Sequence, residues 1–360
     1  MTLPGQADFA YGNTRLRARR STLLRDADYE RLLGTAVPGL LGALEDTPYG
    51  PDADAAGGTD SLRRLHVTIS RHLSRSLTEM RSFYAGRAHA LLGMLLARFD
   101  ADNIIAVLRA KSGGQRAAED ALVHVGWMAG PHSDEILRQN ELAGAVELLA
   151  RSTPDREQGA ALRTAFSEYE RTEDLAAFER AVVADHAARL SARLAAAGAE
   201  AATLLHFAQR EVDERNLLVA LRLRDAVASG AEAETPPAAT RIPGGSIPPE
   251  VFGSALKVPA PAAVATRLGR LAGRTWQRPL ERWAASGDVS ALERELERRR
   301  FEDATSLFVA GDPLAIDVPI AFTAAKQAEA RNLRLLGEAS VRGIDPEVVR
   351  RELLWSKGHS

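Results

Sequence analysis

The stretch Asp100-Ala101-Asp102-Asn103-Ile104 has two counterparts further along the chain. They are Asp213-Glu214-Arg215-Asn216-Leu217 and Glu329-Ala330-Arg331-Asn332-Leu333. Each contains an acidic residue, two variable residues, an asparagine and a branched aliphatic residue. The asparagines are separated by 113 and then by 116 residues. A spacing this regular predicts three copies of one structural unit.

Further markers accompany each asparagine in the same order. Leu65 and Phe178, on predicted helices, stand 38 residues before their asparagines, and Leu292 stands 40 before. A helix start with an acidic first turn follows each asparagine, which suits the positive end of the helix dipole. We therefore predict three homologous helical modules of about 115 residues, each large enough for its own core. The predicted modules are residues 1–131, 132–246 and 247–360, and a Pro- and Gly-rich loop at 229–249 ends the second.

Helix-forming residues dominate nearly the whole chain. Ala, Leu, Arg and Glu are common throughout, and all four favour helix. No segment sustains the alternation of apolar and polar residues that predicts a half-buried strand. The expected fold class is therefore all-α. The helix breakers between Thr47 and Gly58 predict a loop there.

The composition excludes several classes of function. The 360 residues include no cysteine, which excludes disulfides, a thiol nucleophile and cysteine-held zinc or iron–sulfur sites. A net charge of −2 and an aromatic content of 5% argue against a nucleic-acid partner. No uncharged apolar stretch reaches the length of about 18 residues that a membrane span needs. We expect no transmembrane segment, so work at a membrane would depend on a partner.

The repeated asparagine is expected to be structural. It lies on or beside an apolar helix stripe, and a partly buried asparagine must find hydrogen-bond partners. The acidic residue three positions earlier shares its helix face. We interpret the pairs as polar staples that hold a neighbouring loop; they are Asp100 with Asn103, Asp213 with Asn216, and Glu329 with Asn332. The alternative, a ligand site, would have to occur three times.

Four closely spaced arginines stand near the start of the chain: Arg15, Arg17, Arg19 and Arg20. Two interpretations remain open. The arginines form either a solvated or packing face of a helix, or a contact with an acidic partner or with lipid headgroups.

Motifs of catalysis are absent from the sequence. There is no P-loop, no G-x-G-x-x-G and no H-E-x-x-H, and the eight histidines are scattered. We expect no catalytic residue, no cofactor and no metal site. An all-helical enzyme with a site between modules remains an alternative, because a catalytic triad is assembled in space rather than in sequence.

Four segments resemble the C subunit of archaeal and bacterial V-type (A-type) ATPases, the counterpart of the eukaryotic d subunit. They are Tyr11–Ala18 with Leu23–Leu24, Asp100–Ile104 with Leu108–Lys111, Asp213–Asn216 with Leu221–Arg222, and Lys326–Arg334 with Gly343–Glu347. The third copy departs from the pattern, because Gly337-Glu338 stands where the first two copies have Leu-Arg.

The resemblance implies a funnel or cup of three helical modules in a pseudo-threefold arrangement. Such a protein is a non-catalytic rotor adapter. It would join the central shaft, made of the D and F subunits, to the membrane ring of ion-carrying subunits, at the cytoplasmic face of the membrane. The complex would couple proton or sodium transport to ATP hydrolysis or synthesis. The alternative is a generic α-helical scaffold that binds another soluble partner.

Overall fold

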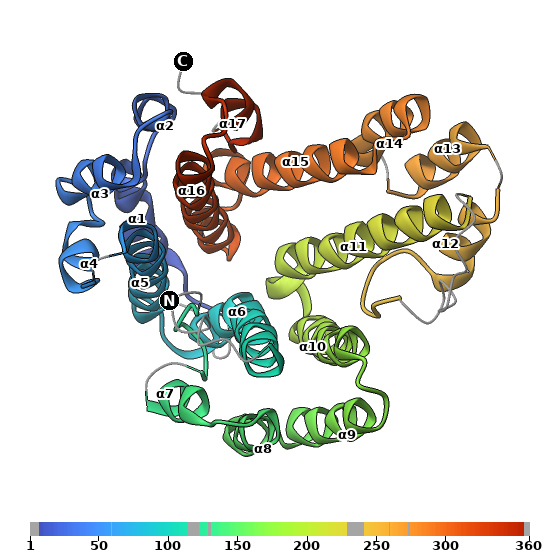
Figure 1. Cartoon of the computed structure of the whole chain (residues 1–360). Helices are drawn as coiled ribbons and strands as arrows, with labels where there is room; N and C mark the ends of the chain where they lie inside the picture. The colour runs from blue at the N-terminus through green and yellow to red at the C-terminus, as the bar shows by residue number, and fades with distance from the viewer. Residues whose placement is uncertain are drawn as a thin grey trace. The chain divides into compact units, whose positions relative to one another are not determined.

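The computed structural model describes residues 7–58, 60–113, 122–128, 131–228, 241–258, 260–272 and 274–355. Within these ranges every regular element is a helix (Figure 1). The predicted all-α class is confirmed. The 229–240 part of the predicted Pro- and Gly-rich loop lies outside the described residues.

The helices differ widely in length, and the three repeat asparagines lie on three of the longest, α6, α11 and α16. The α-helices are α1 Ala10–Arg19, α2 Asp26–Leu32, α3 Val37–Glu45, α4 Gly50–Ala55, α5 Ser61–Ser82, α6 Gly86–Ser112, α7 Pro131–Arg138, α8 Leu142–Ser152, α9 Arg156–Thr172, α10 Leu175–Ala197, α11 Ala202–Ala228, α12 Pro249–Leu256, α13 Pro261–Ala272, α14 Arg274–Ser286, α15 Val289–Ala310, α16 Asp317–Arg342 and α17 Pro346–Glu352. Two short 3₁₀ turns are η1 Arg20–Thr22 and η2 Gly198–Ala201.

The chain forms two compact units. The first contains Met1–Val182 together with Ala304–Ser360, and the second contains Val183–Asp303. The module boundaries that the repeat predicts, 131/132 and 246/247, are a statement about the sequence and stay a prediction.

Local signals explain where several helices begin and end. The Asp60 side chain accepts the backbone N–H groups of Leu62 and Arg63 at the start of α5, which satisfies donors that a helix start leaves free. Asp345 caps α17 in the same way. Gly343 ends α16 with a φ of 65°, a left-handed conformation that glycine adopts without steric cost.

The loop predicted from Thr47 to Gly58 is wrong in its middle, where α4 spans Gly50–Ala55. Pro51 stands in the first turn of α4. A proline there fits a helix because its fixed φ suits the helix and its missing N–H has no intrahelical acceptor to lose. The residue that predicted a loop therefore helps to start a helix.

In the first unit, one apolar core surrounds the second half of α6. Ile104, Val107 and Leu108 of α6 pack with side chains from α7, α8, α9 and α10, and Phe178 belongs to this core. Phe178 is the apolar marker of the second sequence copy. The marker helix of copy two thus packs against the asparagine helix of copy one.

The second unit repeats this relation. Leu217 and Leu221 of α11 pack with α12, α13, α14 and the first half of α15, where Leu292 is buried. Leu292 is the marker of the third copy, and α11 carries the asparagine of the second. Trp276 and Trp283 fill the same core.

The third such contact is made by α16 and α5, within the first unit. Leu65 of α5, the marker of copy one, is fully buried, and a Cβ at Gly337 of α16 would lie 2.6 Å from its Cδ2 atom. The asparagine helix of copy three therefore packs against the marker helix of copy one. All three markers are buried on the asparagine helix of another copy.

Segments near both ends of the chain meet in the first unit. The amide Nδ2 of Asn13 donates to the carbonyl oxygens of Pro313 and Ala315, both at 2.8 Å. The rings of Tyr29 and Trp355 pack edge to face with centroids 6.3 Å apart. None of the described helices is long and apolar enough to cross a membrane.

We predict that Gly337→Leu, which installs the residue of the other two copies, destabilises the protein by about 1–3 kcal/mol, because the larger side chain overpacks the α5–α16 contact. The urea midpoint measures this loss. The control is Gly42→Ala on α3, where a new Cβ meets nothing within 4 Å, and helix propensity should add about 0.5–1 kcal/mol of stability. Equal midpoints for Gly337→Leu and the wild type would refute the close packing.

Candidate functional site

Each repeat asparagine binds one loop residue through both of its backbone groups. Asn103 Nδ2 donates to the carbonyl of Val123 at 2.9 Å and its Oδ1 accepts the N–H of Val123 at 3.0 Å. Asn216 makes the same two bonds to Ile242, both at 2.8 Å. Asn332 makes them to Leu354, both at 2.9 Å. An asparagine amide has a donor and an acceptor side by side, so it can bond both the C=O and the N–H of one loop residue, as a neighbouring β-strand would.

The acidic residues of the first two copies hold the same loops further along. Asp100 accepts the N–H groups of Trp127 and Met128, at 3.4 and 3.2 Å. Asp213 accepts those of Ser246 and Ile247, at 2.8 and 3.2 Å. In both copies the two N–H groups stand four and five residues after the residue bound by asparagine. We call this asparagine–acid–loop arrangement the loop clamp.

A glycine precedes the N–H groups in both clamps. A Cβ at Gly126 would overlap the carboxylate of Asp100, and one at Gly245 would overlap that of Asp213. Sequence reasoning missed these two glycines. The signal that could have found them is an aliphatic residue three positions before each glycine, in Val123–Gly126 and Ile242–Gly245.

The third clamp uses different donors. Glu329 accepts the N–H of Leu24 at 2.5 Å, the hydroxyl of Tyr49 at 3.0 Å and the ammonium of Lys326 at 2.7 Å. Two of these partners lie in N-terminal loops, Leu24 before α2 and Tyr49 before α4, and the third, Lys326, stands one turn earlier on α16 itself. A glutamate, one methylene longer than aspartate, reaches them.

A charged position six residues after each asparagine pairs with the residue that follows the apolar marker. Arg109 binds Glu179 at 2.7 Å, and Arg222 forms an ion pair with Glu293. In the third copy Glu338 Oε1 lies 3.6 Å from His66 Nε2. The third copy therefore differs at both positions of the pair. Glu338 stands where the first two copies have an arginine, and His66 stands where they have a glutamate.

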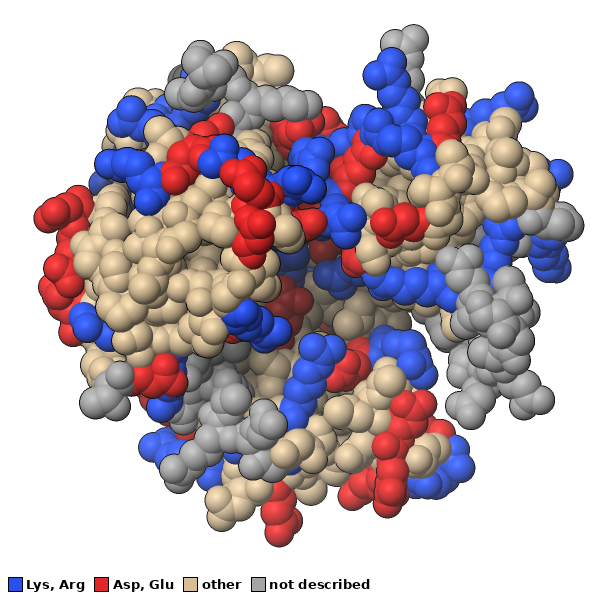
Figure 2. Space-filling view, turned by 45° about the horizontal axis from the view of Figure 1, so that its top comes forward, with Lys and Arg blue, Asp and Glu red and all other residues tan. Residues whose placement is uncertain are grey.

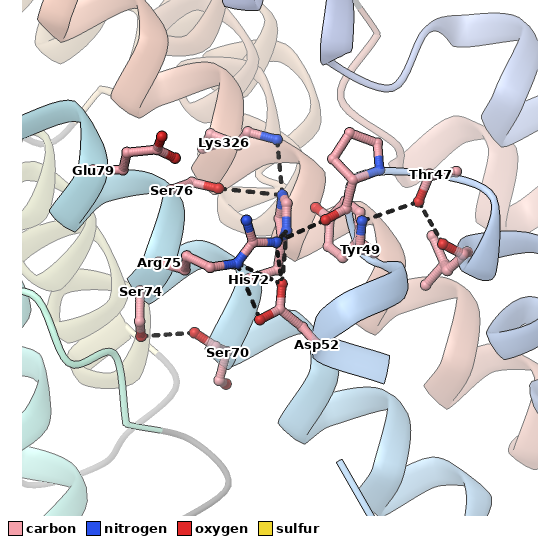
Figure 3. Close-up of polar contacts among 12 residues, drawn as sticks. Thr47, Tyr49, Asp52, Ser70, His72, Ser74, Arg75, Ser76, Glu79 and Lys326 are labelled. Carbon is pink, nitrogen blue, oxygen red and sulfur yellow. Dashed lines mark hydrogen bonds and ion pairs between the residues drawn. The ribbon is translucent and has the colours of Figure 1, made fainter. Parts of the chain in front are cut away.

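A buried polar network joins the third clamp to α4 and α5 (Figure 3). His72 Nδ1 lies 3.1 Å from a carboxylate oxygen of Asp52, and His72 Nε2 lies 3.1 Å from Lys326 Nζ. The ring of Tyr49 stacks on that of His72 with centroids 3.7 Å apart. Arg75 donates to the same Asp52 carboxylate at 2.5 Å.

A lysine ammonium only donates, so the contact with Lys326 assigns Nε2 as the acceptor and Nδ1 as the donor to Asp52, while the Arg75 guanidinium lies 3.2 Å from the same Nδ1. Burial and the positive charge of Lys326 lower the pKa of His72 to about 3. His72 and Lys326 are each 2% exposed. The network contains the residue types of a catalytic proton relay. Its groups are bonded to one another, however, so its role is to hold α4, α5 and α16 together.

Two of the four N-terminal arginines, Arg15 and Arg19, share the ring of Phe83. Arg15 lies over the ring of Phe83 with its guanidinium carbon 4.1 Å from the centroid. Arg19 forms an ion pair with Glu79, and Arg20 lies over the ring of Phe308 at 5.2 Å. Arg17 is exposed. Arg15 and Arg20 are exposed as well, so the contact of these arginines with an acidic partner or with lipid headgroups stays a prediction.

The visible face carries both charges intermixed, without one extended field of a single sign (Figure 2). Among the described residues no group of three or more His, Asp or Glu side chains could hold a metal ion.

Comparisons with known proteins agree over nearly the whole chain. The family model described as ATP synthase (C/AC39) subunit matches residues 12–352. The V-type ATP synthase C subunit of Thermus thermophilus is 30% identical over 351 residues, covering 96% of this chain and 98% of that protein. The A-type ATP synthase C subunit of Haloferax volcanii is 26% identical over 357 residues, covering 98% and 99%. That of Halorubrum lacusprofundi is 29% identical over 375 residues, covering 98% and 99%.

We predict that Asn216→Ala destabilises the protein by about 1–3 kcal/mol, because it leaves both backbone groups of Ile242 without their partner. Thermal unfolding measures the change. The matched control is Gln277→Ala, which removes an exposed amide from α14 in the same unit and should stay within about 0.5 kcal/mol. An unchanged melting temperature for Asn216→Ala would count against the staple.

A pH dependence follows from Asp100. Burial, opposed by the N–H groups of Met128 and Trp127, raises its pKa to about 6. The folded protein therefore holds this proton more tightly than the unfolded chain, and the stability that the proton provides is present at pH 4 and lost as the pH rises through 6. The loss is about 3 kcal/mol for a shift of this size.

The measurement is the urea midpoint of wild type and Asp100→Asn at pH 4 and pH 7. The difference between the two proteins should change with pH, because only the wild type loses this proton. Glu170→Gln, at an exposed carboxylate of α9, serves as the control. Parallel pH profiles for wild type and Asp100→Asn would show that Asp100 titrates normally.

Proposed function

Because the chain belongs to the ATP synthase (C/AC39) subunit family, we propose that it is the rotor adapter of an A- or V-type rotary ATPase. It couples the central shaft, made of the D and F subunits, to the membrane ring of ion-carrying subunits. It is peripheral, at the cytoplasmic face of the membrane, and it breaks no bond itself. Rotation links ATP hydrolysis or synthesis to the transport of protons or sodium ions.

One observation carries the proposal. The family match spans residues 12–352, so it includes all three sequence copies rather than a single helical module. A generic scaffold that shared only one bundle with the family would not align in this way.

The described contacts suit a part that transmits torque. An adapter must deform little under load, and close-packed helices have low compressibility. The loop clamps at Asn103, Asn216 and Asn332 fix the segments that follow the long helices, where a chain would otherwise yield first. The proposal includes the three modules that the repeat predicts and the pseudo-threefold cup that the family resemblance implies.

The proposal is tested by affinity purification of the tagged full chain from its native host. The D and F subunits of the shaft and the membrane ring should be recovered together with it. In a strain that lacks the chain, ATP hydrolysis by the catalytic head should persist, whereas ATP-driven ion uptake into membrane vesicles should be lost. Wild-type chain should restore uptake, and so should Arg163→Gln, which alters an exposed ion pair of α9.

Two outcomes would overturn the proposal. Recovery of neither shaft nor ring would exclude the rotor position, and recovery of a different soluble protein in their place would favour the scaffold. Unchanged ion uptake in the deletion strain would exclude a coupling role.

A further inference from the structure

A pocket of about 240 Å³ opens between α6 and α16 in the first unit. The residues that precede the repeat asparagines line it: Asp102 beside Asn103 on α6, and Ala330 with Arg331 before Asn332 on α16. Since a water molecule takes up about 30 Å³ in the liquid, the pocket has room for a small polyatomic ion and several waters. Neither the family resemblance nor the loop clamps account for this space.

Arg334 brings a poorly compensated positive charge to the pocket. In the part of the chain that the structure describes, its hydrogen bond runs from Nη2 to the hydroxyl oxygen of Ser70 at 2.8 Å, and no carboxylate pairs with it. Burial lowers the pKa of this guanidinium. A guanidinium has five N–H donors and stays charged at any physiological pH. Most of its donors are therefore available to a bound anion.

Two further donors of α16 stand on the same helix face. Gln327, Arg331 and Arg334 follow the spacing i, i+4 and i+7, which places them on one stripe, and all three line the pocket. Arg331 is held in position by a hydrogen bond to the carbonyl of Glu352 at 2.8 Å. Ala330 lies among them and, with its single methyl group, leaves the space that a ligand needs.

The opposite wall adds one donor and one acid. The bond from Asn103 to the Val123 carbonyl uses one of the two hydrogens on Nδ2, and Asn103 lines the pocket. Asp102 is exposed at the same wall. The unpaired charge of the pocket is therefore that of Arg334, and a planar guanidinium group matches the oxygens of phosphate and carboxylate.

We propose that the pocket between α6 and α16 is an oxyanion site that takes a phosphate or a carboxylate, with Arg334 as its principal ligand. A bound oxyanion compensates the half-buried guanidinium of Arg334 and spans α6 and α16 next to two of the loop clamps. Occupancy therefore stabilises the first unit, because a ligand that binds only the folded state shifts the unfolding equilibrium.

The test uses the full chain and inorganic phosphate, with chloride at equal ionic strength as the reference. Calorimetric titration should show one saturable site with a Kd near or below about 1 mM, and phosphate should raise the melting temperature. Arg334→Gln should weaken binding at least about tenfold, the loss of one charged hydrogen-bonding group. The matched control Arg163→Gln, on α9 of the same unit, should bind like the wild type.

A second variant keeps the experiment decisive if Arg334→Gln folds poorly. Ala330→Met retains both arginines and fills the space between them, so it should abolish phosphate binding. The proposal is overturned if the wild type shows no saturable binding at a phosphate concentration of about 10 mM, about ten times the expected Kd. It is also overturned if folded Arg334→Gln and Ala330→Met bind phosphate as tightly as the wild type.

A further arm identifies the source of the oxyanion, and this arm rests on the proposed function. Phosphate binding is compared between the free chain and the chain assembled with the shaft. Loss of the site on assembly assigns it to a carboxylate of a shaft protein, whereas retention assigns it to free phosphate. Failure to assemble counts against the rotor role alone, because the titration of the free chain is independent of it.

Discussion

The structure depends on an asparagine amide that replaces a missing backbone partner. A loop that leaves a long helix must cross the protein with its own N–H and C=O groups unsatisfied, which is costly once they are buried. Asn103, Asn216 and Asn332 each satisfy both groups of one loop residue. The loop is then fixed at one residue, so the apolar side chains on either side of that residue have one position against the helix in which to pack.

Each sequence copy packs one of its helices against a helix of another copy. In each contact described here, the asparagine helix of one copy packs on the marker helix of the next, and copy three packs on copy one. The paired residues Glu338 and His66 differ together from the Arg–Glu pairs of the other two contacts. Two acids in this position would repel one another, and the glutamate faces a histidine instead. The departures from the repeat thus follow its contacts.

The sequence predicted the features that depend on spacing along the chain. The all-α class, the buried markers and the residues of the asparagine–acid pairs could be read from periodicity. The network around His72 could not, because its lysine is 254 residues away and nothing in either local sequence announces the partner. The prediction of a loop over Thr47–Gly58 was wrong in its middle, because a proline such as Pro51 can start a helix as well as form a turn. Gly126 and Gly245 were not predicted, because their role is a steric fit against a carboxylate, and its trace in the sequence is only an aliphatic residue three positions before each glycine.

The contacts between the N-terminal and C-terminal segments determine the order in which parts of the first unit can fold during synthesis. Asn13 and Leu24 bind residues that stand 300 and 305 positions later. At a ribosomal rate of about 5–20 residues per second, those partners emerge roughly 15–60 s after the first helices. The core around α6 needs no residue beyond Val182, so it can close first. Helices α1, α3 and α5, which pack on α16, must then wait with apolar surface uncovered, and that surface is what a molecular chaperone would bind during synthesis.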